Sequence, residues 1–120
     1  MSDGYSCKIA IASTDGQYVN VHFGRAERFL IYGLKENGDT DFLEERNVNT
    51  VCHGGYHLVD EMRKKAESFS DCEYVIALKI GDGAVRMLGE YGISPIEHPG
   101  DIEEALDKLI RYRKVKNLFG

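Results

Sequence analysis

A thiol and two imidazoles lie close together near the middle of this chain. Residues 52–57 read Cys-His-Gly-Gly-Tyr-His, so Cys52, His53 and His57 flank or adjoin a pair of glycines. Thiolate and imidazole are ligands that suit zinc, iron and iron–sulfur clusters. Glycine lets the backbone approach a bulky ligand closely, because it carries no side chain. This segment is therefore the first candidate for binding a metal or a metal–sulfur cluster.

The supply of soft ligands limits the kind of site. Outside residues 52–57, the chain has only Cys7, Cys72, His22 and His98. A closed tetrahedral zinc site needs a second Cys or His pair at short spacing, and the sequence has none. So few ligands favour an open, partly ligated site for a cluster that is delivered preformed. The alternative is a glycine-rich loop before a helix that contains Cys and His without binding anything.

Two further motifs could bind a ligand. Residues 22–25 read His-Phe-Gly-Arg in a predicted loop, where His22 could present a free ring nitrogen. The alternative is a surface histidine that is hydrogen-bonded to backbone. Residues 81–84 read Gly-Asp-Gly-Ala between a predicted strand and a predicted helix, where backbone N–H groups can bind anions. This motif lacks the length and the lysine of a P-loop, so close packing of strand and helix explains it equally well.

The remaining chemical groups favour structural roles. Cys72 precedes an apolar run and is predicted to be a small buried residue, and Cys7 is interpreted in the same way. Several carboxylates could in principle serve two-metal hydrolysis, but their spacing matches no recognisable pattern. They are Asp15, Glu44, Glu45, Asp60 and Asp82.

Apolar runs and turn residues predict the elements that position these motifs. Strands are expected at residues 8–13, 29–34, 41–47, 74–78 and 93–97, with a short strand or an irregular connection at 18–21. Asn37-Gly38 predicts a hairpin between two of them. Helices are expected after residue 57, around 84–91, and after Asp101, which should cap the last one. The apolar face of the first helix is predicted to consist of Leu58, Val59, Met62, Ala66 and Phe69. Strands that first form a meander and then alternate with helices predict an α/β fold, a three-layer α/β/α sandwich with a mixed sheet.

Composition narrows the class of protein. The net charge is −5 and the pI is near 5.3, which argues against binding nucleic acid by phosphate neutralisation. No apolar stretch approaches the ~20 residues that span a bilayer, so no membrane partner is expected. Three widely spaced cysteines are unlike a disulfide framework and favour the reducing cytoplasm. Residues 1–120 are expected to form a single domain, with the basic segment 111–120 as a frayed tail.

Taken together, the motifs resemble the dinitrogenase iron–molybdenum cofactor biosynthesis family, which includes NifX-like carriers and the C-terminal domain of NifB. The resemblance runs from about Lys8 to Ile110, and the order and spacing of the motifs carry it. They are residues 9–16, 22–26, 52–57, 71–72, 80–84 and 92–93.

The resemblance implies a ribonuclease H-like fold and transient binding of an iron–sulfur precursor or an iron–molybdenum-type cluster. It also implies assembly proteins that donate and accept that cluster. The histidine of the family's His-Phe-Gly motif, a favoured cluster ligand, corresponds to His22. Ligand chemistry adds Cys52 and His57 as metal ligands, with His53 as a further cofactor-binding candidate.

The family's cluster-building enzyme carries a Cys-x3-Cys-x2-Cys triplet that this chain lacks, so we expect a carrier or chaperone and not an enzyme. Two alternatives stay open. One is a regulatory domain that binds a small molecule or phosphate at residues 81–84. The other is a hydrolase of the ribonuclease H-like class.

Overall fold

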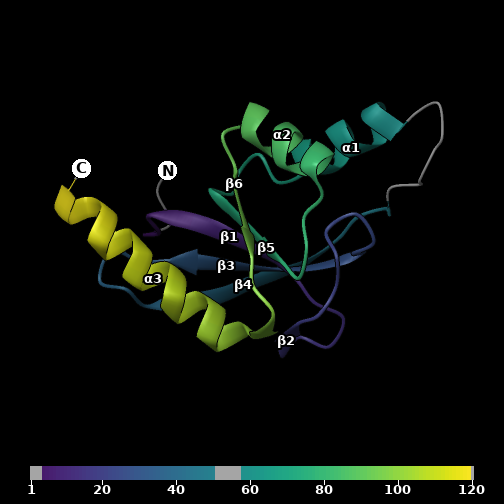
Figure 1. Ribbon diagram of the computed structural model, residues 1–120. Helices are drawn as coiled ribbons and strands as arrows, with labels where there is room; N and C mark the ends of the chain where they lie inside the picture. Colours follow the sequence, from purple (N-terminus) through teal and green to yellow (C-terminus); the bar gives the residue numbers. More distant parts are fainter. Residues whose placement is uncertain (1–3, 51–57, 120) are drawn as a thin grey trace.

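A five-stranded mixed sheet forms the centre of the molecule, in the strand order β4-β3-β1-β5-β6 (Figure 1). The structure is a computed structural model that describes residues 4–50 and 58–119. Strand β1 pairs antiparallel with β3 and parallel with β5, and β6 runs parallel to β5. The predicted mixed sheet is therefore confirmed. Its strands are β1 (Cys7–Ala12), β3 (Arg28–Leu34), β4 (Thr40–Asn47), β5 (Tyr74–Ala77) and β6 (Ser94–Glu97).

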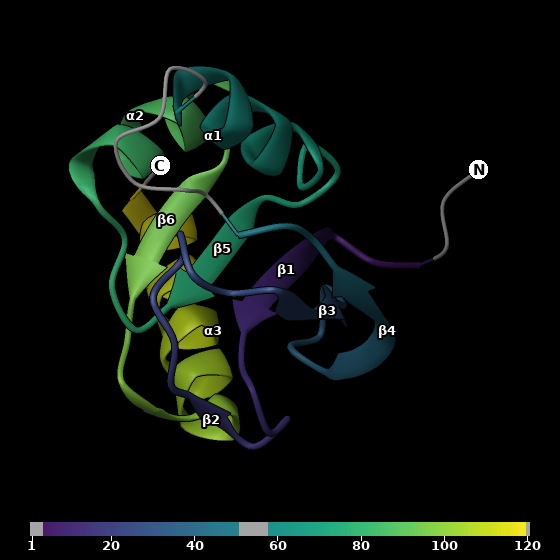
Figure 2. The same cartoon turned by 90° about the vertical axis from the view of Figure 1, so that its right-hand side faces the viewer.

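The helices cover both faces of this sheet. Helices α1 (Leu58–Glu67) and α2 (Asp82–Glu90) lie on one face, and α3 (Ile102–Phe119) lies on the other (Figure 2). Successive strand side chains point to opposite faces, so β1 contributes to two cores. Ala10 and Ala12 pack in the cluster that includes α1 and α2, while Ile9 and Ile11 pack in the cluster that includes α3.

Local sequence signals account for several boundaries. Gly38 adopts a φ of 95° in the turn between β3 and β4, a conformation that favours glycine, and the predicted hairpin is confirmed. Asp101 caps α3, because its Oδ1 accepts hydrogen bonds from the backbone N–H of Glu103 at 2.7 Å and Glu104 at 3.4 Å. Strand β6 is an edge strand, as Pro95 predicted.

The segment 18–21, predicted as a short strand or an irregular connection, contains a strand that lies outside the main sheet. Strand β2 (Tyr18–Val19) pairs antiparallel with β7 (Gly100–Asp101) as a separate two-stranded sheet. The turn before β2 depends on Asp15, whose Oδ1 accepts hydrogen bonds from the backbone N–H of Gln17 and Tyr18, both at 2.9 Å. These bonds hold the pKa of Asp15 below its usual range.

Two expectations about the helices need correction. The apolar face predicted for the first helix included Val59 and Phe69, but Val59 is 61% exposed and α1 ends at Glu67. Phe69 lies in the turn that follows the helix, and its side chain is buried. The expected frayed tail is also not what the structure has, since α3 continues to Phe119. Within that tail, Arg113 donates hydrogen bonds to Glu73 and to the Tyr74 hydroxyl, which fastens the helix to the sheet.

None of the helices in the described ranges combines the length and the apolarity that crossing a bilayer requires.

Candidate functional site

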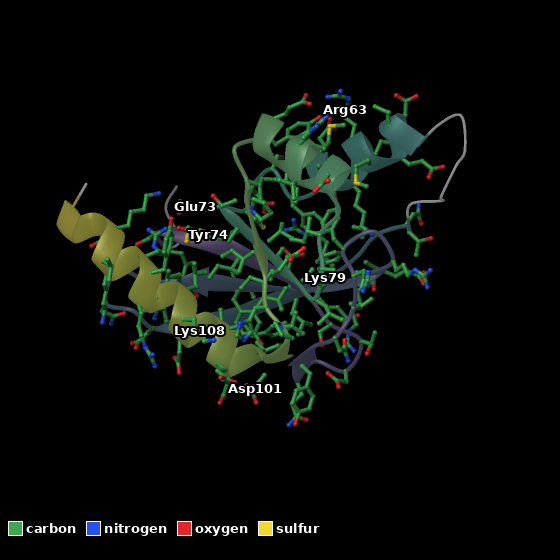
Figure 3. The ribbon with its side chains drawn as sticks, viewed as in Figure 1. Arg63, Glu73, Tyr74, Lys79, Asp101 and Lys108 are labelled. Carbon is green, nitrogen blue, oxygen red and sulfur yellow. The ribbon has the colours of Figure 1, made fainter. Side chains whose placement is uncertain are left out.

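A cavity of about 380 Å³ lies where three separate segments meet. The loop at residues 22–26 contributes His22 and Arg25, and the start of α1 contributes Val59 and Met62. The third segment begins with Lys79 on the connection from β5 to α2 (Figure 3) and continues along α2 to Met87. Ligand sites of α/β proteins often lie beyond the carboxyl ends of strands, and this cavity lies beyond the end of β5.

Backbone hydrogen bonds hold the 22–26 loop against the β5–α2 connection. The N–H of Phe23 donates to the carbonyl of Lys79 at 2.9 Å, and the N–H of Leu78 donates to the carbonyl of Val21 at 3.0 Å. The Phe23 ring is fully buried, with its centroid 5.7 Å from that of Phe29. The loop is therefore anchored at Phe23, while the neighbouring His22 is exposed at the cavity.

The start of α2 forms the wall beside this loop. Gly81 occupies the N-cap position in an extended conformation, and no side-chain hydrogen bond caps the helix there within the described part of the chain. Free N–H groups and the positive end of the helix dipole favour an anion at such a position. A Cβ built on Gly81 or Gly83 meets no atom within 4 Å, which is consistent with the open space of the cavity.

The charged side chains that line the cavity are positive. Arg25 and Lys79 both line it, and none of the described lining residues is acidic, although the whole chain has a net charge of −5. Met62 and Met87 add thioether sulfur to an otherwise apolar wall. The cavity thus combines an imidazole, two cations and a helix N-terminus, which together suit an anionic ligand that accepts nitrogen coordination.

The structure brings together only part of the predicted site. His22 and three residues of the 81–84 motif, Gly81, Gly83 and Ala84, line the same cavity, although the sequence presents them as separate motifs. Cys52, His53 and His57 lie outside the described residues. The described chain resumes at Leu58, the first residue of α1, and this helix lines the cavity with Val59 and Met62.

The other histidine and the other two cysteines, which were not predicted as ligands, lie away from this cavity. His98 lines a different groove, between β6 and α3, where its Nε2 is buried and has no hydrogen-bond partner among the described residues. Cys72 is buried as expected, and burial raises the pKa of its thiol to about 12, so it stays a neutral thiol. Cys7 is half-buried, and burial raises its pKa as well.

The scattered carboxylates form no metal site in the described ranges, 4–50 and 58–119. Across these ranges, no group of three His, Cys, Asp or Glu side chains is placed to hold a metal ion. Asp15 belongs to the turn before β2, and Glu45 forms an ion pair with Arg28 at 2.8 Å. Glu44 likewise pairs with Arg46 at 3.0 Å.

Sequence reasoning missed several residues around the cavity. Arg25 and Lys79 each lie within two residues of a motif glycine, a signal that could have singled them out. The helical pattern places Met62 only on the apolar face of a helix, and it gives no sign of a role for Lys65 of α1. Lys65 is buried below the 22–26 loop, which no pattern of charges in the sequence indicates.

The fold and the cavity define a class of protein, a small α/β domain with a cavity that is lined by cationic side chains beyond the end of a parallel strand. Residues 6–112 match the family model described as dinitrogenase iron-molybdenum cofactor. The chain therefore belongs to this family, and the predicted resemblance is confirmed.

Among curated relatives, the chain is 33% identical to the FeMo cofactor biosynthesis protein NifB of Herbaspirillum seropedicae, over 78% of this chain and 18% of NifB. It is 31% identical to Protein NifX of Klebsiella pneumoniae, over 83% of this chain and 62% of NifX. The matched region is thus about a fifth of that NifB and about three fifths of that NifX.

Solved structures share the fold. The NMR structure of a Thermotoga protein described as a NifB protein superposes with a TM-score of 0.57 at 28% identity, covering 86% of each chain. A crystal structure from Methanocaldococcus jannaschii, described as a dinitrogenase, gives a TM-score of 0.57 over 88% of each chain. Its 15% identity makes it a likeness of fold alone.

Proposed function

We propose that this protein is a carrier in the assembly of an iron–molybdenum-type cofactor, and that its cavity holds an iron–sulfur precursor for transfer. Family membership and the names of the NifB and NifX relatives support the process. The cluster is the cargo of such a carrier, and we assign no catalytic step to the chain. Proteins that donate and accept the cluster would be its partners.

The observation that carries this proposal is the position of His22 in a cationic cavity. Imidazole is an established ligand of iron in clusters, and the net charge of a cluster is one of the properties that its surroundings tune. Arg25, Lys79 and the start of α2 would stabilise the negative charge of a sulfide-rich cluster. The volume of about 380 Å³ is within the usual range of ligand cavities, ~300–1,000 Å³.

Cys52 and His57 are the proposed additional ligands, and His53 is a further candidate. The support is sequence position and ligand chemistry, because these residues directly precede α1, which lines the cavity. A thiolate near a helix N-terminus is favoured by the helix dipole. A site with few protein ligands suits a carrier, since each bond to the cluster must break at transfer.

Other predictions stay proposals. They are that residues 1–120 form a single domain, and that its finer architecture is a three-layer α/β/α sandwich of the ribonuclease H-like type. A location in the cytoplasm is also proposed, on the basis of the few, widely spaced cysteines.

Anaerobic loading with an iron–sulfur cluster tests the function. We expect the wild-type protein to take up iron and sulfide and to develop cluster absorbance and an EPR signal after reduction. His22→Ala should lower uptake, whereas His98→Ala, which changes a histidine in the other groove, should not. Cys52→Ala should act like His22→Ala, with Cys7→Ala as its control. A wild-type protein that binds no cluster would refute the carrier function, and normal uptake by His22→Ala would refute the site.

A second candidate function is binding of a small molecule or phosphate at the start of α2. The uncapped N-terminus at Gly81, with Arg25 and Lys79 beside it, favours this alternative. Thermal unfolding with ATP or inorganic phosphate would test it. A raised midpoint in protein that takes up no metal would support the alternative over the carrier.

A further inference from the structure

Lys65 is a buried cation below the loop that presents His22. The residue is 4% exposed, and among charged side chains that the structure describes it is the one classed as buried. Its Nζ donates hydrogen bonds to the carbonyl of Ala26 at 2.7 Å and to the carbonyl of Gly24 at 3.2 Å. Both acceptors belong to the loop, whereas Lys65 belongs to α1.

Aromatic rings complete the surroundings of this ammonium group. Nζ lies 5.1 Å from the centroid of the Phe23 ring and 5.6 Å from that of Phe29. Both distances are within the ~6 Å at which a cation is attracted to a ring face. Two carbonyl acceptors and two rings therefore replace part of the water that burial removes. These contacts offset part of the free-energy cost of burying the ammonium group.

Burying a lysine costs free energy, so its contacts indicate what it does. A packing role alone would be met by methionine or leucine, which carry no charge to desolvate. Lysine instead supplies N–H donors to the carbonyls of Gly24 and Ala26 in a tight turn. In that turn, the carbonyl of His22 accepts hydrogen bonds from the N–H of Arg25 at 3.2 Å and of Ala26 at 3.0 Å. The backbone that follows His22 is thus fixed from both sides.

We propose that Lys65 is the positioning residue for His22, because its ammonium ties the His22 loop to α1. The inference rests on the proposed function, in which His22 is a cluster ligand. Helix α1 also supplies Val59 and Met62 to the cavity, so one side chain holds two walls at a fixed separation. Lys65 itself is not among the residues that line the cavity, and it acts through the loop.

The test compares Lys65→Met with Lys64→Met, which makes the same change at an exposed neighbour on the same helix. NMR of the cluster-free protein with labelled histidine reports the environment of His22. We expect the His22 signals to shift or broaden in Lys65→Met and to stay unchanged in Lys64→Met. Cluster affinity should fall roughly tenfold in Lys65→Met alone, as for other residues that orient a ligand. Unchanged His22 signals and unchanged affinity in folded Lys65→Met would overturn the proposal.

The two readouts separate this proposal from the carrier function. If the wild-type protein binds no cluster, the carrier function fails, and the His22 signals still decide the role of Lys65.

A measurement on the wild-type protein covers the case in which Lys65→Met does not fold. Burial lowers the pKa of Lys65 to about 8, while Glu27 acts in the opposite direction. The backbone amide signals of residues 22–26 should therefore move together with a midpoint near the pKa of the Lys65 ammonium, measured on its own side-chain signals. Loop signals that do not follow the titration of Lys65 would overturn the proposal.

Discussion

The backbone N–H of Phe23 donates a hydrogen bond to the carbonyl of Lys79 at 2.9 Å, which joins two motifs that are far apart in the sequence. The bond places the His22 loop beside the segment that leads into α2. His22, the residue before Phe23, lines the cavity. Lys79 also lines it, as does Gly81 two residues later. The cavity is thus a product of tertiary structure, and its residues can be tested one wall at a time.

Removing the anchor of the loop should damage both stability and binding. Phe23→Ala deletes a fully buried ring that packs against Phe29 and Phe69. We expect the free energy of unfolding, measured in urea, to fall by about 3–5 kcal/mol. Phe42→Ala, at a ring that is 55% exposed, should cost about 1 kcal/mol. Similar losses in the two variants would contradict the anchoring role of Phe23.

Filling the cavity at the start of α2 should separate binding from stability. Gly83→Ala adds a methyl group where no atom lies within 4 Å, so the protein should fold normally. Alanine favours a helix over glycine, and stability should rise by up to about 1 kcal/mol. Cluster uptake should nevertheless fall. Gly89→Ala, in the same helix and equally unobstructed, should stabilise without affecting uptake. Equal uptake by both variants would show that Gly83 does not face the ligand.

The cations of the cavity should contribute a binding energy that depends on salt. Arg25→Gln and Lys79→Gln each remove one positive charge from the lining. We expect each change to weaken cluster binding about two- to fivefold at low ionic strength, and less at high salt. Lys108→Gln changes a lysine of α3 that lines the other groove (Figure 3), and it should have no effect. Loss of affinity that is independent of salt would argue against an electrostatic role.

Lys65 should make stability depend on alkaline pH. Its pKa in the folded protein is about 8, below the usual lysine value of 10.5, because burial disfavours the ammonium. Between these two values the unfolded chain binds more protons than the folded one, so the free energy of unfolding contributed by this group rises with pH. The contribution is at most about 3 kcal/mol across that window. In urea titrations from pH 7 to pH 11, the free energy of unfolding of wild-type protein relative to Lys65→Met should therefore rise with pH, because other groups with shifted pKa values, such as Cys72, titrate in both proteins.

Residue patterns in the sequence predicted most elements of the fold, because the relevant signals are local. Alternating or continuous apolar residues indicated the strands, Asn37-Gly38 the hairpin turn, and Asp101 the start of α3. The errors arose where the structure depends on distant contacts. The exposure of Val59 and the pairing of β2 with β7 depend on packing that one segment does not encode.

The candidate site was only partly accessible from sequence. His22, Gly81, Gly83 and Ala84 belong to motifs that the sequence singles out, but nothing local indicates that they share a cavity. Lys65 was overlooked because lysine is normally exposed, and burial becomes possible only when carbonyls and rings from other segments surround it. The ligand roles of Cys52, His53 and His57 stay predictions.

The strand order has a consequence for how the cavity forms during folding. Strands β1, β3 and β4 are close in sequence, and β3 pairs with both of the others, whereas β5 joins β1 only after a long loop has closed. Contacts of high sequence separation form slowly, because closing the intervening chain costs entropy. We therefore expect the meander to form early and the Phe23–Lys79 bond to form late. A newly made chain would fold much of its sheet before the walls of the cavity came together.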